Sequence, residues 1–133
     1  MLMSFQPMII FAETEEIWTF NDVNKMSNKL AHYFLKLGYG RGDSIAIFME
    51  NDPKFMIVLL ALSKIGVAAA LINSNLTDNG LVHSINIAKC RGCVYHHNLE
   101  GAVAKVAANL VCPPEKAPFQ VKLSFRFEID KNM

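Results

Sequence analysis

The sequence predicts an α/β fold: a parallel βαβαβ sheet with flanking helices, a short N-terminal hairpin and a C-terminal edge strand. Short apolar runs of strand length alternate with longer segments whose apolar residues recur every three or four positions. Strands that alternate with helices in this way form parallel sheets with right-handed crossovers. The 133 residues, 52% of them hydrophobic, suffice for one sizeable core. We expect residues 1–112 to form a partial α/β subdomain and residues 113–133 to form a tail with one β-strand.

The first elements expected are a hairpin and an amphipathic helix. Residues 8–11 and 17–20 are short β-prone runs on either side of an acidic turn. Thr19 and Asp22 have the spacing of a capping box, which begins a helix. In that helix apolar and polar residues occupy opposite faces, because each set recurs at three- and four-residue steps. The apolar residues are Val23, Met26, Leu30, Phe34 and Leu37, and the polar residues are Asn21, Lys25, Asn28, Lys29, His32 and Lys36.

The first buried strand and the second helix follow a glycine-rich turn. We expect Gly38 and Gly40 to supply the left-handed backbone that ends the first helix. Residues 44–49 are a nearly continuous apolar run, which is typical of a strand covered on both faces. A helix is predicted over residues 53–65, with proline at its first position and an end at Gly66.

Two more strand and helix units complete the predicted subdomain. Residues 67–72 repeat the buried-strand pattern, and Thr77 is expected to cap a helix that reaches about residue 89. A third strand is predicted over residues 92–95, and Asn98 is expected to cap the last helix, which ends near residue 110. After a proline-rich break, residues 119–129 alternate strictly between apolar and polar side chains, which predicts an edge or antiparallel strand.

The composition excludes several classes of partner and location. Thirteen basic and 12 acidic residues give a net charge of +1, so the charge total indicates no field that would gather nucleic acid or an anionic membrane. The apolar runs are too short for a transmembrane segment or a secretory signal. Three cysteines without a secretory signal indicate free thiols in a reducing compartment, so we expect this chain to be cytoplasmic.

Candidate ligand residues lie where predicted strands end. In an open parallel sheet, ligands bind beyond the carboxyl ends of the strands, which here means residues 50–52, 73–75 and 96–98. Asn73 and Asn75 are weak ligand-loop candidates on this ground. Turn formation and helix capping also explain polar residues at these places, and we favour this structural explanation over ligand binding. No catalytic, cofactor-binding or metal-ligating residue is predicted.

Three motifs have structural explanations. The glycines of residues 38–42 lack the order of strand, glycine loop and helix that a dinucleotide site needs. Residues 41–43 spell an adhesion tripeptide, but a turn explains their residue types. Cys90 and Cys93, followed by two histidines, have the residue types of a zinc or redox site, yet no second pair of this kind exists. We expect structural thiols and loop imidazoles.

Two segments resemble the fatty acid transport protein and very-long-chain acyl-CoA synthetase family, a branch of the adenylate-forming enzymes. They are WTFNDVNKMSNKLAHYFLKLGYGRGDSIAIFMEN and ALSKIGVAAALINSNL, and the resemblance covers about residues 7–108. It implies part of the N-terminal domain of an adenylate-forming enzyme. The full-length enzymes activate a long-chain fatty acid with ATP and Mg and transfer it to CoA. The resemblance also implies the cytosolic face of the endoplasmic reticulum or the plasma membrane.

The family's catalytic motifs have no counterpart in these 133 residues. The resemblance implies a phosphate loop, later adenylate-binding motifs and a catalytic lysine, all downstream. No family catalytic residue maps onto this chain, which we expect to be an inactive product of truncation, a partial gene model or an isoform. Alternatively, it is a noncatalytic interaction module that pairs with a full-length synthetase or with itself, through the edge strand at 119–129. A third hypothesis, a free-standing binding domain, needs a ligand at the strand-end loops.

Overall fold

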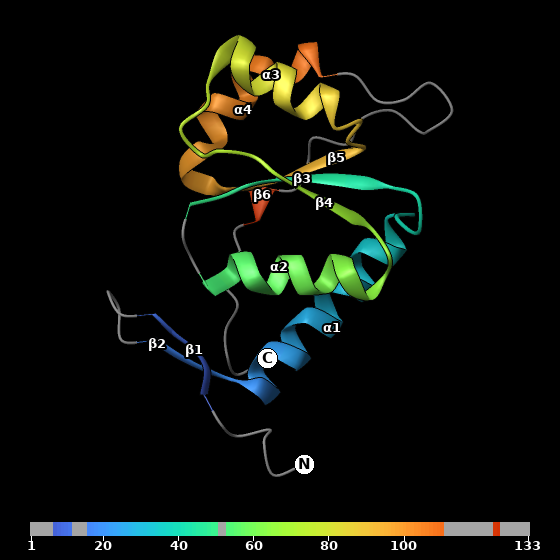
Figure 1. The fold of residues 1–133 in the computed structure, drawn as a ribbon, viewed down its shortest axis with the longest axis vertical. Helices are drawn as coiled ribbons and strands as arrows, with labels where there is room; N and C mark the ends of the chain where they lie inside the picture. The colour runs from blue at the N-terminus through green and yellow to red at the C-terminus, as the bar shows by residue number, and fades with distance from the viewer. Residues whose placement is uncertain (1–6, 12–15, 51–52, 111–123, 126–133) are drawn as a thin grey trace.

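The computed structural model describes residues 7–11, 16–50, 53–110 and 124–125. Within these ranges a parallel sheet lies between two helical layers, and an antiparallel hairpin lies beyond one of the layers (Figure 1). This is the predicted α/β architecture. The described strands are β1 (Pro7–Phe11), β2 (Glu16–Thr19), β3 (Ser44–Phe48), β4 (Ala68–Leu71), β5 (Gly92–His96) and β6 (Ser124–Phe125). The described α-helices are α1 (Phe20–Lys36), α2 (Pro53–Lys64), α3 (Asp78–Ile87) and α4 (Glu100–Val106). Two 3₁₀ turns, η2 (His97–Leu99) and η3 (Ala107–Asn109), lie on either side of α4.

The parallel sheet has the strand order β4-β3-β5-β6. Strand β3 lies inside it, with Ile45 opposite Ala69 of β4 and Gly92 of β5. Strand β6 pairs in parallel with β5 and forms the predicted C-terminal edge strand in its described part. The remainder of the strand predicted over 119–129 lies outside the described residues.

Each face of the sheet has its own helical layer and its own core. Helices α1 and α2 cover one face, and α3 and α4 cover the other (Figure 1). Ile45 and Ile47 pack in the core formed with α1 and α2, whereas Ala46 and Phe48 pack in the core formed with α3 and α4. Successive side chains of a strand point to opposite faces, so a strand buried on both faces is apolar at every position. None of the described helices is both long and apolar enough to span a bilayer.

The capping box of α1 is present as predicted. The Thr19 hydroxyl oxygen accepts a hydrogen bond from the Asp22 N–H at 3.1 Å, and the Asp22 carboxylate accepts one from the Thr19 N–H at 3.0 Å. These two bonds satisfy N–H groups that a helix start otherwise leaves without partners. The predicted apolar face is also confirmed: Val23, Met26, Leu30 and Phe34 are buried, and Leu37 is half-buried.

The prediction for Gly40 is wrong. The left-handed positions are Gly38 at φ 89° and Gly42 at φ 91°, and Gly40 is not among them. Gly42 lies inside the turn that the Asp43 N–H closes by donating to the Gly40 carbonyl at 3.1 Å. A turn of this size can require positive φ at its third residue, where glycine is free of steric cost.

Strand β4 is less buried than its apolar sequence predicts. Ala68 and Leu71 are exposed, and Ala69 and Ala70 are half-buried. The strand lies at the end of the described sheet, with β3 on one side only. An apolar run alone does not distinguish a central strand from a terminal strand.

The two predicted caps of the later helices differ from the structure. Thr77 is at the N-cap position of α3, as predicted, with an extended backbone, but its side chain makes no capping hydrogen bond. Asn98 lies inside η2, and its N–H donates to Nδ1 of His96 at 3.4 Å. His96 therefore caps η2, and α4 begins after Leu99 without a side-chain capping bond.

Candidate functional site

The carboxyl ends of the sheet strands meet at one edge, since the strands are parallel. Asn73 and Asn75 lie there as predicted, just after β4, and both are exposed. The Asn73 side-chain oxygen accepts a hydrogen bond from the Asn75 N–H at 2.9 Å, and its carbonyl accepts one from the Leu76 N–H at 3.1 Å. This pattern shapes a turn around the Asn73 side chain. Ligand binding by either asparagine stays a prediction.

The loop after β5 contributes imidazoles to the same edge. The rings of His96 and His97 lie 4.4 Å apart between centroids, with an angle of 36° between their planes. His97 and Asn98 are exposed, and Nδ1 of His96 serves as a local cap. After β3, Glu50 is exposed, and residues 51–52 lie outside the described ranges. The described part of the edge therefore presents amides and imidazoles in locally bonded loops.

Cys90 and Cys93 are buried free thiols, as predicted. Burial raises the pKa of Cys90 to about 11. Burial, and secondarily the charge of Cys90, raises the pKa of Cys93 to about 12. In the described part of the chain, no group of three or more His, Cys, Asp or Glu side chains could hold a metal ion. The two thiols are core residues, and the third cysteine, Cys112, lies outside the described ranges.

We expect Cys90 and Cys93 to resist alkylation in the folded protein. The thiolate is the reactive species, and a raised pKa keeps the thiolate fraction small until the pH approaches the raised value. In a Cys112→Ser chain, iodoacetamide labelling followed by mass spectrometry should be slow at about pH 8 and should accelerate toward about pH 11. The urea-unfolded chain is the control and should label completely at the lower pH. Rapid labelling of the native chain at that pH would contradict this assignment.

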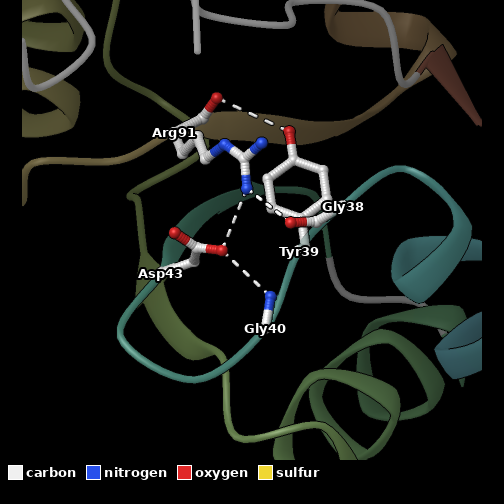
Figure 2. A network of polar contacts seen from close by, with 5 residues as sticks. All are labelled: Gly38, Tyr39, Gly40, Asp43 and Arg91. Carbon is white, nitrogen blue, oxygen red and sulfur yellow. Dashed lines mark hydrogen bonds and ion pairs between the residues drawn. The ribbon is translucent and has the colours of Figure 1, made fainter. Parts of the chain in front are cut away.

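A polar network at the opposite edge of the sheet joins the start of β5 to the turn between α1 and β3 (Figure 2). Arg91 Nη1 donates to the Gly38 carbonyl at 2.7 Å and to Asp43 Oδ2 at 3.0 Å. The same carboxylate oxygen accepts a hydrogen bond from the Gly40 N–H at 2.9 Å. The Arg91 guanidinium also lies 4.7 Å from the ring centroid of Tyr39. These contacts hold the turn against the neighbouring strand.

The ion pair in this network is largely removed from water. The side chains of Arg91 and Asp43 are only 14% and 9% exposed. Buried charges are retained where partners and hydrogen bonds offset the loss of hydration, and both conditions are met. The sequence predicted a turn at Asp43 but did not indicate that Arg91 would pair with it, because the two residues are 48 positions apart. We interpret the network as a structural clamp.

A second polar cluster joins the two helices of one layer. The Lys64 ammonium group, near the end of α2, donates to three neutral oxygens on α1. These are Oδ1 of Asn24 at 3.0 Å, Oγ of Ser27 at 2.8 Å and Oδ1 of Asn28 at 2.7 Å. The contacts fix the two helices to each other.

Comparison with known sequences assigns this scaffold to an enzyme class. The profile of the family described as AMP-binding enzyme matches residues 5–131. The chain is 35% identical over 102 residues to long-chain fatty acid transport protein 1 of Rattus norvegicus. This match covers 77% of this chain and 16% of that protein. It is 35% identical over 96 residues to long-chain fatty acid transport protein 6 of Mus musculus, with coverage of 71% and 16%. The chain therefore spans about one sixth of the length of these relatives.

Solved structures share the fold. An anthranilate CoA ligase, AuaEII, in complex with anthranoyl-AMP superposes with a TM-score of 0.76 at 16% identity, over 82% of this chain and 21% of that chain. A fatty acyl CoA synthetase of Mycobacterium tuberculosis superposes with a TM-score of 0.70 at 21% identity, over 79% and 21%. These likenesses show that the sheet and its two helical layers match the scaffold of adenylate-forming enzymes.

Proposed function

Because the chain belongs to the AMP-binding enzyme family, we propose that it is the N-terminal region of a fatty acid–CoA ligase of the fatty acid transport protein kind. The 35% identity over 102 residues to long-chain fatty acid transport protein 1 carries this proposal. In the proposed reaction the longer protein joins a fatty acid carboxylate to AMP from ATP, with release of pyrophosphate. The CoA thiol then displaces AMP to give the acyl-CoA thioester.

The proposed contribution of this chain is structural. The sheet and its helical layers form one part of the ligase scaffold, and the clamp of Arg91 and Asp43 holds a turn of that scaffold against β5. Among the described residues, no group of three or more His, Cys, Asp or Glu side chains could hold a metal ion. We assign ATP, Mg, CoA and the fatty acid to the longer protein, at the cytosolic face of the endoplasmic reticulum or plasma membrane, because the family's catalytic motifs have no counterpart in these 133 residues.

Activity of the purified 133-residue chain tests this proposal. With oleate, ATP and Mg, we expect no acyl-adenylate and no release of pyrophosphate, since the family's catalytic motifs have no counterpart in the sequence. A full-length fatty acid transport protein assayed in parallel is the positive control. Sustained turnover by the chain alone would disprove the assignment to a noncatalytic part. The transcript beyond Met133 provides a second test, and we expect an in-frame continuation into a Ser/Thr/Gly-rich phosphate loop.

A second candidate function is association with a full-length synthetase or with another copy of the chain. Strand β4 supports it, because this strand ends the described sheet and its Ala68 and Leu71 are exposed. An edge strand with short apolar side chains can pair with another strand through its backbone. Size-exclusion chromatography of the chain, alone and mixed with the full-length enzyme, distinguishes the two proposals. A monomer that never co-elutes with the enzyme argues against this second function.

A further inference from the structure

Asn79 and Gly80 are neighbours in the first turn of α3, and both are exposed. Asn79 is the only asparagine in the sequence that is followed by glycine. This dipeptide is the one most prone to lose the side-chain amide of its asparagine, because glycine has no Cβ to hinder the approach of its own backbone nitrogen. The pair is therefore a candidate site of covalent modification.

Neither the backbone nor the packing of α3 requires glycine at position 80. Gly80 is not among the described residues with positive φ. A Cβ added to Gly80 would meet only the end of the Leu76 side chain, at 3.6 Å, which is an ordinary contact distance. Glycine also weakens a helix relative to alanine. Replacement of Gly80 by alanine should therefore preserve the fold while it changes the chemistry of the pair.

The first turn of α3 is held by few contacts. The Thr77 side chain makes no capping bond, and Asp78 has a left-handed φ of 51°, which is strained for a residue with a side chain. The Leu81 N–H donates to the Thr77 carbonyl at 3.3 Å, and the Gly80 N–H, which precedes this bond, has no acceptor among the described residues. Helix ends open more readily than helix centres. Opening of this turn allows the Gly80 nitrogen to reach the Asn79 side chain.

Two other asparagines in and before α3 have side chains that are already bonded. Oδ1 of Asn73 accepts a hydrogen bond from the Asn75 N–H at 2.9 Å. Nδ2 of Asn86 donates to the Asn109 carbonyl at 3.1 Å. The Asn79 side chain has no hydrogen-bond partner among the described residues, so no such bond opposes its rotation toward the backbone.

We propose that Asn79 is a site of spontaneous deamidation, in which the Gly80 nitrogen attacks the side-chain Cγ. A new N–C bond forms and the Cγ–Nδ2 bond breaks. Nδ2 takes up the proton of the Gly80 N–H and leaves as ammonia, and a five-membered succinimide ring remains. Water then opens the ring at either of its carbonyls and gives aspartate or isoaspartate at this position.

The two products affect α3 differently. Each adds one negative charge to a chain whose net charge is +1. Aspartate keeps the normal backbone and places its carboxylate in the first helical turn, where the helix dipole favours negative charge. Isoaspartate routes the backbone through the former side chain, and the added methylene group disrupts the start of the helix. This inference goes beyond the proposed ligase and does not depend on it, because the reaction needs only water.

Incubation of the folded 133-residue chain at mildly alkaline pH, which favours the deprotonated backbone nitrogen, tests the proposal. Trypsin releases residues 65–89 as one peptide that contains Asn79 and three other asparagines. Tandem mass spectrometry then locates the exchange of an amide for a carboxyl group at each of them. We expect Asn79 to convert severalfold faster than the other three. Part of the product should accept a methyl group from S-adenosylmethionine through an isoaspartate methyltransferase.

Gly80→Ala is the matched control, since it keeps Asn79 and adds a Cβ beside the attacking nitrogen. It should slow the conversion severalfold, and circular dichroism should show an unchanged fold, because the site accommodates a Cβ. A digest at zero time corrects for conversion during handling. Equal rates in the two chains, or conversion of Asn79 no faster than that of the other asparagines, would overturn the proposal. Conversion confined to the urea-unfolded chain would also overturn it, since the helix start would then protect the amide.

Discussion

Replacing Phe34 with alanine is expected to lower the free energy of unfolding by about 3–5 kcal/mol. The Phe34 side chain is 0% exposed and belongs to the core between the sheet and the layer of α1 and α2. Its ring packs edge-on against Tyr39, with 5.9 Å between centroids and an angle of 86° between the planes. The substitution removes this contact and leaves a cavity that the surrounding residues fill only in part. Urea denaturation followed by circular dichroism measures the change.

Leu35→Ala is the matched control for Phe34→Ala. Leu35 adjoins Phe34 in the sequence, but its side chain is 49% exposed. We expect a loss of less than about 1 kcal/mol, because no buried cavity forms at an exposed position. If the two variants lost the same stability, the assignment of Phe34 to the core would be wrong.

Arg91→Ala is expected to destabilise the fold by about 3 kcal/mol. Removing one partner of a buried ion pair typically costs about 3–5 kcal/mol, because the other charge remains without compensation, and partial solvent exposure of this pair places the loss at the lower end. The variant loses the bonds to the Gly38 carbonyl and to the Asp43 carboxylate, and the carboxylate keeps its bond from the Gly40 N–H. Arg91→Lys keeps the charge but not the forked guanidinium, and should lose less.

Two controls separate the ion pair from general effects of charge. Arg41→Ala removes an exposed arginine from the same turn and should change stability by less than about 0.5 kcal/mol. The double variant Asp43→Asn, Arg91→Met should lose less than the sum of its two single variants, because the charges interact directly. Additive losses in this cycle would show that the pair contributes no coupling energy.

Local features of the fold could be predicted from the sequence because their causes lie within a few residues. The capping box of Thr19 and Asp22 spans a single helical turn, and its hydrogen bonds form as predicted. The continuous apolar run of β3 predicted a strand buried on both faces, and the structure confirms it. The division at residue 112 stays a prediction.

Other features depended on groups that are distant in the sequence. The pattern of glycines did not reveal that Gly42, and not Gly40, takes the left-handed position. It also did not indicate that Arg91, the residue just before β5, holds the same turn. Asn73 and Asn75 were predicted at the correct edge, but the hydrogen bond between them is a detail of the loop conformation. The apolar run of β4 did not show that this strand ends the described sheet.

The sequence by itself determined the order of strands and helices, the apolar face of α1 and the resemblance to acyl-activating enzymes, since these follow from short-range patterns and residue identities. Only the tertiary structure decided which strand lies at the edge, which arginine pairs with Asp43 and how charge is distributed over the surface. The net charge of +1 did not reveal that Lys25, Lys29, His32 and Lys36 share the exposed face of α1, because a total contains no information on position. Packing of the apolar face of α1 against the sheet leaves the lysines of this helix on its exposed face.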